Sequence, residues 1–285
     1  MATYEIIQPD VAGSTYNISD GSICHHIALD GIGLPQIERI TQANPNIDGA
    51  FDEGFTIKPR ELTLRLYFAA STKAALDGIR DQIYEVFKPF DDPLKLRVTR
   101  DDGSVRQIDV HTIGVLDLPE SQRTAEFDQL FVVRLLAPYP FWYHPTQQVT
   151  TFVPSVSGYT FNVNYNGSWW EWPIIKVYGY VTGFSMDITL SLPGGNQNYQ
   201  FFFSPIPAGD VFTYDLRPGY KTIKNAAGVS QLGNLTENSY TALSNFRLWP
   251  TPYFSAGVNP IHGTFSAKDA SHKIEVYYYN RFLGV

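Results

Sequence analysis

The stretch that decides the fold is Leu62–Phe68, which reads LTLRLYF. Its apolar side chains alternate with Thr63, Arg65 and the amphipathic Tyr67, which is the period of a strand that buries one face. Helical spacing follows at once, because Ser71 or Thr72 can cap a segment whose apolar residues recur three and four apart until Pro89. These residues are Leu76, Ile79, Ile83, Val86 and Phe87. The sequence therefore predicts a strand followed by one helix.

More strands follow the helix. Residues 94–99 alternate between apolar and polar side chains, and Asp101-Asp102-Gly103 supplies residues that tolerate a positive φ, so a hairpin into Val105–Val110 is expected. Phe131–Leu136 is apolar on both faces except at Arg134, which is typical of a strand buried between two layers. The first half is therefore predicted to be an α+β unit.

A domain boundary is predicted near residue 150. The segment 138–160 contains four prolines and no helical period, so we expect an N-terminal domain over residues 1–150 and a C-terminal domain over residues 151–285. Turn residues in the second half recur every ~8 to 12 positions, which is the spacing of a β-sandwich or jelly roll. Its expected strands are Trp172–Val177, Met186–Leu190, Tyr199–Phe203, Val211–Leu216, a strand around Ile223, Phe246–Leu248 and Ile274–Tyr279. The fold class is mainly β.

The composition excludes several classes of protein. Apolar residues make up 44% of the 285 and charged residues 17%, which excludes a disordered chain and indicates extensive buried surface. A net charge of −7 without a basic block argues against direct binding of nucleic acid. Cys24 is the only cysteine, so an intrachain disulfide is excluded. We expect neither a secretion signal nor a membrane span, because no apolar run approaches the ~18 to 20 residues of a bilayer-crossing helix.

One long connection, Thr41–Ile57, has few apolar residues to hold it against a core. It contains Asn44, Asn46, Asp48 and Glu53, together with glycines typical of turns. A loop of this length in a compact domain is usually functional or mobile. The sequence leaves two interpretations open, a flexible surface loop and an arm that contacts a neighbouring subunit.

No residue cluster predicts catalysis or a cofactor. Cys24-His25-His26 could form a reactive or metal-binding group, but neighbouring strand residues point to opposite faces, so a structural role is favoured. Asp91-Asp92 and Asp101-Asp102 resemble carboxylate pairs, but each precedes a Pro or Gly at a turn, where Asp is favoured by its own backbone hydrogen bonds. The chain is therefore expected not to be an enzyme and to bind neither metal nor cofactor.

Trp169-Trp170-Glu171-Trp172 is the segment best suited to bind a ligand. Exposed indoles stack on sugar rings, but aromatic residues also fill contacts between sheets and between subunits. We expect Trp172 to pack inside the second domain and Trp169 or Trp170 to be partly exposed. Packing or an interface is the favoured interpretation, and recognition of a bacterial surface glycan is the alternative.

The order of these elements resembles the distal tail proteins of siphophages. In the first half the matching residues are the predicted strand and helix, Phe87-Lys88-Pro89, Pro93–Leu96 and Pro138–Trp142. In the second half they are Trp172–Gly179, Tyr214–Arg217 followed by Lys221, and Ala256–Ile261, where Ala256 stands in place of the proline of a Pro-Gly-x-Asn turn. The resemblance extends from about residue 60 to the end, whereas residues 1–55 match poorly.

The resemblance implies a ring-forming N-terminal domain and a galectin-like β-sandwich. It implies a homohexameric ring that joins the phage tail tube to the tail-tip hub or tail-associated protein, with receptor-binding proteins as further partners. The expected location is the virion tail tip, after assembly in the host cytoplasm.

Overall fold

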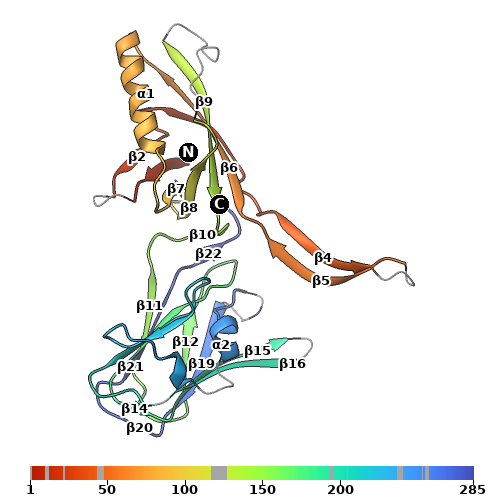
Figure 1. Cartoon of the computed structure of the whole chain (residues 1–285), viewed down its shortest axis with the longest axis vertical. Helices are drawn as coiled ribbons and strands as arrows, with labels where there is room; N and C mark the ends of the chain where they lie inside the picture. Colours follow the sequence, from red (N-terminus) through yellow and green to blue (C-terminus); the bar gives the residue numbers. More distant parts are fainter. Residues whose placement is uncertain are drawn as a thin grey trace. The chain divides into compact units, whose positions relative to one another are not determined.

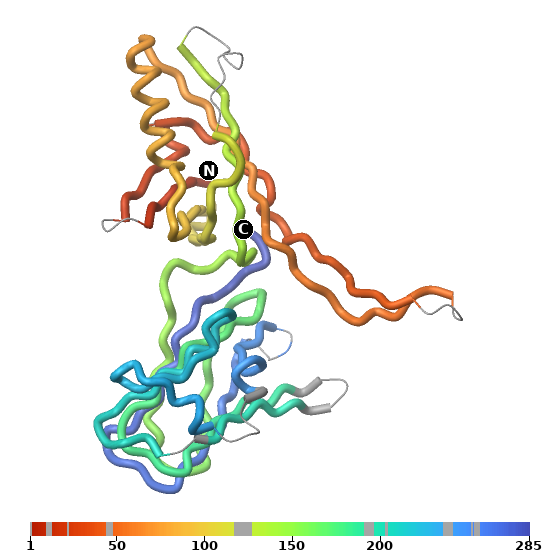
Figure 2. The backbone as a smooth tube through the Cα atoms, viewed as in Figure 1, coloured from red at the N-terminus to blue at the C-terminus, as the bar shows by residue number. Residues whose placement is uncertain are grey.

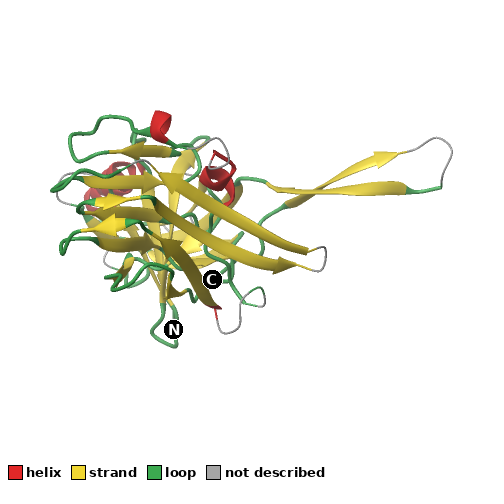
Figure 3. Cartoon of the chain, turned by 90° about the horizontal axis from the view of Figure 1, so that it is seen from below, coloured by secondary structure: helices red, strands yellow, loops and turns green. Residues whose placement is uncertain are grey.

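In the computed structural model the chain folds into two compact units (Figure 1). It describes residues 2–9, 13–21, 23–43, 48–116, 127–192, 195–203, 205–235, 240–251, 253 and 257–285. The first unit contains Met1–Pro145 and Phe282–Val285, and the second contains Thr146–Arg281. Strands dominate both units, which confirms the mainly β fold class (Figure 3). In the described residues, no helix is long and apolar enough to cross a membrane.

The first unit is built on a sheet with the strand order β2-β1-β7-β8-β9-β6-β3. The strands are β1 (Thr3–Ile7), β2 (Thr15–Asn17), β3 (His25–Asp30), β6 (Arg60–Ala69), β7 (Leu94–Thr99), β8 (Val105–Ile113) and β9 (Asp128–Ala137). The short β10 (Trp142–Tyr143) pairs with β8. Every second side chain of β6 is buried, as the alternation in Leu62–Phe68 predicted.

The helix α1 (Lys73–Phe87) packs along the sheet of the first unit (Figure 1). Thr72 caps it, since its side-chain hydroxyl accepts a hydrogen bond of 3.2 Å from the amide of Ala75. Its apolar face is buried in the same core as β6 and β9. The buried helix residues are Leu76, Ile83, Val86 and Phe87, which confirms the predicted helix and its end before Pro89.

The last four residues of the chain belong to the first unit, which the sequence did not predict. The guanidinium of Arg106 donates to the carbonyl of Gly284 and packs on the ring of Phe282, 4.0 Å from its centroid. The amide of Val285 donates to the carbonyl of Ile32 at 3.2 Å. Residues 282–285 are thus fixed by both hydrogen bonds and packing.

The second unit is a β-sandwich of two antiparallel sheets with one core between them. One sheet has the order β11-β21-β13-β17-β18, with β11 (Gln148–Phe152), β21 (Lys273–Tyr278), β13 (Ile174–Tyr178), β17 (Val211–Asp215) and β18 (Thr222–Lys224). The other has the order β12-β19-β15-β16, with β12 (Tyr159–Asn164), β19 (Val258–Thr264), β15 (Phe184–Leu192) and β16 (Gly195–Phe203). The smaller elements of this unit are β14 (Val181–Thr182), β20 (Ala267–Lys268), the 3-10 turn Leu232–Asn234 and α2 (Tyr240–Asn245). The last strand, β22 (Arg281–Phe282), pairs with β10 in the sheet of the first unit.

Several predictions need correction. Residues 138–160, expected to be broken chain, contain β10, β11 and the start of β12, because their prolines lie between short strands. The strand expected from Trp172 begins at Ile174. Phe131–Leu136 lies in β9, but only one face of this strand is buried, since Val132 is 36% exposed. The strand expected at Phe246–Leu248 is reduced to a single β-bridge between Leu248 and Glu171. Residues 3–57, for which no strand was predicted, contain β1 to β3, β4 (Ile37–Ala43) and β5 (Ala50–Ile57). The predicted pairing of the segments around 186–190 and 199–203 is confirmed by β15 and β16, although Pro193 and Gly194 of its turn lie outside the described residues.

Candidate functional sites

The long connection expected at Thr41–Ile57 is a β-hairpin and not a loop. The strands β4 (Ile37–Ala43) and β5 (Ala50–Ile57) pair only with each other in the described part of the chain, and the hairpin projects from its unit (Figures 1 and 2). The register shifts between Ile40 and Thr41, so Glu53 is an extra residue in a β-bulge. Asp48 and Glu53 are exposed on the hairpin, whereas Asn44 and Asn46 lie outside the described residues.

The hairpin is unusual because it leaves large apolar side chains in water. Phe51 is 56% exposed, Ile37 49%, Ile40 44% and Phe55 42%. Arg39 pairs with Asp52 at 2.9 Å and packs over the ring of Phe55, and Lys58 pairs with Glu38 at 2.5 Å, but these contacts are themselves exposed. A two-stranded hairpin is only marginally stable alone in water. The described hairpin therefore presents an apolar surface to solvent, and covering this surface would stabilise it.

The residues of Cys24-His25-His26 do not combine into a reactive site. Burial raises the pKa of the Cys24 thiol to about 12, so the thiol stays protonated, and its Sγ points to the carbonyl of Ile18. His26 stacks on Tyr4 at 3.8 Å, and burial lowers the pKa of its imidazole. In the described parts of the chain, no group of three or more His, Cys, Asp or Glu side chains could hold a metal ion.

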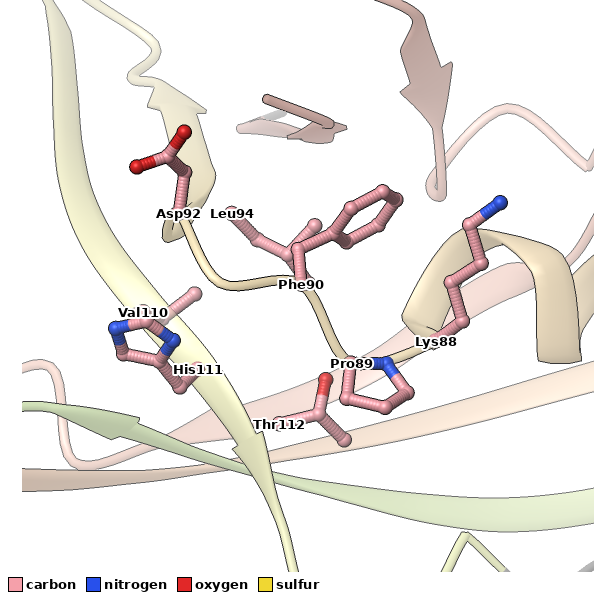
Figure 4. Close-up of a pocket in the computed structure, with 8 residues that line it drawn as sticks. All are labelled: Lys88, Pro89, Phe90, Asp92, Leu94, Val110, His111 and Thr112. Atoms are coloured by element: carbon pink, nitrogen blue, oxygen red, sulfur yellow. The ribbon is translucent and has the colours of Figure 1, made fainter. Parts of the chain in front are cut away.

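The carboxylate pairs lie on turns. Asp102 accepts hydrogen bonds from the amide of Ser104 at 2.9 Å and from its hydroxyl at 2.6 Å, and these bonds lower the pKa of Asp102. Asp92 lines a pocket together with His111 (Figure 4), but the pocket holds only about 70 Å³. That volume has room for a few waters and not for a sugar ring. Asp101 lies on the same turn as Asp102, and Asp91 and Asp92 lie in the bend before β7.

A tryptophan cluster lies in the second unit, where the sequence placed it, but it is larger than expected. Trp169 and Trp170 are half-buried, and their ring centroids lie 3.9 Å apart with the ring planes tilted by 38°. Trp172 donates to the carbonyl of Ser244 at 2.9 Å and packs against the core of the unit, as predicted, but it is only half-buried. The enclosed indole is Trp249, which is 4% exposed.

Sequence analysis missed two members of this cluster, Arg247 and Trp249. The guanidinium carbon of Arg247 lies 4.1 Å from the ring centroids of both Trp170 and Trp249. The available signal was a single arginine within the apolar run Phe246–Trp249. In a strand, its side chain would point away from those of Phe246 and Leu248, which are both buried.

Comparison with known proteins identifies the kind of protein that has this fold. Residues 12–133 match the model of the phage tail protein RIFT-related domain, so the chain carries a phage tail domain in its first unit. The match begins at residue 12, so it extends further towards the N-terminus than the motifs that carried the resemblance, which begin near residue 60. No curated protein sequence matches the chain.

Two solved structures are similar over the full length. The Dit protein (gp 19.1) of phage SPP1, described as a hub adsorption apparatus of phages that infect Gram-positive bacteria, is 13% identical, with a TM-score of 0.66 and 99% of each chain covered. A chain of the phage P2 baseplate in its activated conformation with Ca is 8% identical, with a TM-score of 0.49 and 100% of each chain covered. The resemblance to siphophage distal tail proteins is therefore confirmed: the chain contains a phage tail domain and has the fold of a Dit protein. The matched domain supports a structural place in a phage tail.

Proposed function

We propose that the chain is a tail-tip adaptor that forms a homo-oligomeric ring, expected to be a hexamer, and joins the tail tube to the baseplate or tail-tip hub. In this proposal the first unit forms the ring, and the second unit, as a galectin-like sandwich, is the platform for receptor-binding or other tail-tip proteins. The subunits assemble in the host cytoplasm, and the protein catalyses no reaction. The likeness to the Dit protein of SPP1 supports the fold on which the proposal rests.

The exposed hairpin β4–β5 is the observation that carries the proposal. A neighbouring copy that covered its four apolar side chains would gain about 1 kcal/mol from each, since full burial of such a side chain stabilises by about 1.5–3 kcal/mol and each is now about half exposed. A closed ring repeats the same contact at every subunit, so a small gain per hairpin accumulates around the ring.

The test replaces apolar residues of the hairpin without removing its strands. Phe51→Ser with Phe55→Ser should lower the mass measured by light scattering towards that of one subunit, while the melting temperature changes little, because neither ring lies in a core. Val149→Ser in β11 is the control, since Val149 is 49% exposed and lies outside the hairpin. If the double variant assembled like the unaltered chain, alone and with the tail tube protein, the hairpin would not be the intersubunit arm.

A second candidate function is recognition of a bacterial surface glycan by Trp169 and Trp170. The partial exposure of these two adjoining indoles favours it.

A further inference from the structure

The guanidinium of Arg247 is held between two indoles. Besides its contacts of 4.1 Å with Trp170 and Trp249, its carbon lies 5.7 Å from the ring of Trp172. Among the described residues no carboxylate forms an ion pair with Arg247, and its Nε is buried without a hydrogen-bond partner. The residue as a whole is only half-buried, so part of its side chain reaches solvent. The charge is therefore held by aromatic rings and partly accessible to a ligand.

An arrangement of this kind is costly for the protein alone. Desolvation by the surrounding side chains lowers the pKa of Arg247, and buried charges in folded proteins are normally paired or fully hydrogen-bonded. The other arginines in this part of the unit follow that rule. Arg217 pairs with Asp215 at 2.6 Å, and Arg281 pairs with the buried Glu171. Stacking on indoles compensates for part of the cost at Arg247, but an anion would compensate for more.

A second cation and a further aromatic ring lie near this cluster. The ammonium of Lys221 donates to the hydroxyl of Ser244 at 2.9 Å, and the carbonyl of the same Ser244 accepts from Trp172. Lys221 has a φ of +44°, which is strained for a residue with a side chain. At the other side of the cluster, Tyr253 is 45% exposed and its ring centroid lies 5.0 Å from that of Trp249. Two positive groups thus accompany a row of aromatic rings, in a chain whose net charge is −7.

We propose that this cluster is a binding site for an acidic saccharide. The indole and phenol faces suit the C–H faces of sugar rings, and the guanidinium suits a carboxylate or phosphate carried by the sugar. A neutral sugar would leave the charge of Arg247 unpaired, and the carboxylate of an acidic peptide has no ring to stack on the indoles. The proposal assigns the ligand contact to Arg247 and Trp170, with Lys221 as the second cation, and it does not depend on ring formation.

Binding is tested with the full chain by tryptophan fluorescence and saturation-transfer NMR. The probes are an oligoglucuronate, glucose 1-phosphate, neutral maltotetraose and tetraglutamate. We expect the carboxylate or the phosphate probe to bind, which distinguishes the two anionic groups, and maltotetraose and tetraglutamate to bind at least about tenfold more weakly.

Variants distinguish binding at the cluster around Arg247 from non-specific attraction of an anion to positive charge on the protein. Arg247→Met should weaken binding of the acidic probe by at least about tenfold, the loss expected for one charge-assisted pair, and Arg247→Lys should weaken it less. Lys224→Gln removes the same charge from the exposed edge strand β18 and should leave binding unchanged. Should Arg247→Met lose its fold, Trp169→Ala provides the second test, because the ring centroid of Trp169 lies 3.9 Å from that of Trp170, the indole assigned to the ligand.

Three results would overturn the proposal: equal affinity for acidic probes and maltotetraose, unchanged binding in folded Arg247→Met or Trp169→Ala, or tetraglutamate as the best probe. The last result would identify the cluster as a surface for an acidic protein segment. In none of these cases would the adaptor role be affected.

Discussion

Arg60 is expected to be the most sensitive polar residue of the first unit. It is 3% exposed, and its guanidinium donates to four backbone carbonyls. The acceptors are Pro140 at 3.0 Å and Gly31, Gly33 and Leu283 at 2.6 Å each. Burial lowers the pKa of Arg60 to about 10, so the side chain still carries its charge at neutral pH. One side chain thus connects the loop before β4, the chain after β9 and the last residues of the protein.

The substitution Arg60→Met keeps the length of the side chain and removes every donor. A hydrogen bond from a charged group contributes about 1.5–3 kcal/mol. The substitution also removes the desolvation cost of the buried charge, so the total loss is smaller than the sum of the four contributions. We expect a loss of about 3–5 kcal/mol, which is less than four such hydrogen bonds would give if they were additive. With a urea dependence of about 2 kcal/mol/M, the unfolding midpoint should fall by about 2 M. Arg60→Lys should lose less, because an ammonium can reach only some of the carbonyls.

The assay can separate the two units. Trp142 is the only tryptophan of the first unit, and the other four belong to the second. Urea unfolding followed by fluorescence, together with hydrogen exchange of peptides from each unit, should place the loss in the first unit. A midpoint shift below about 0.5 M, or equal destabilisation of both units, would refute the role assigned to Arg60.

Further predictions concern single groups. Burial opposes ionisation of Glu275, but hydrogen bonds from Lys273, Tyr277 and Tyr178 outweigh it and hold the pKa of Glu275 at about 2, below the ordinary 4.5. The stabilisation by ionised Glu275 is therefore present above pH 4.5 and is lost as the pH falls towards 2. In Glu275→Gln, the free energy of unfolding should not show this loss between pH 4.5 and pH 2. Cys24 should react with iodoacetamide at pH 8 only after unfolding, and rapid labelling of the native chain would contradict its burial. Glu171→Ala should cost the second unit about 3–5 kcal/mol in urea unfolding, because it removes the buried carboxylate that pairs with Arg281; a loss below about 1 kcal/mol would show that the pair contributes little.

The sequence predicts those elements whose signal is local. The alternation of Leu62–Phe68 and the spacing from Leu76 to Phe87 follow directly from the periods of a strand and a helix, and both predictions are confirmed. The hairpin β4–β5 escaped prediction because its strands bury no face in the described structure, so the alternation that marks a half-buried strand is absent.

The functional residues that sequence reasoning missed depend on contacts distant in the chain. Arg60 and Leu283 are 223 residues apart, and no local pattern connects them. Trp170 and Arg247 meet because the segment before β13 lies beside the segment after α2, where Glu171 and Leu248 form a β-bridge. Turn chemistry at Asp101-Asp102-Gly103, by contrast, needed only neighbouring residues and was predicted correctly.

The most direct test of the adaptor account is the mass and shape of the assembled full chain, alone and with the tail tube protein. We predict a closed ring in negative-stain images and, by native mass spectrometry, a species of six times the 32.1 kDa subunit, which is lost in the Phe51→Ser, Phe55→Ser double variant. A chain that remained monomeric under both conditions, or a ring that formed equally well in the double variant, would contradict the claim that the hairpin joins the subunits.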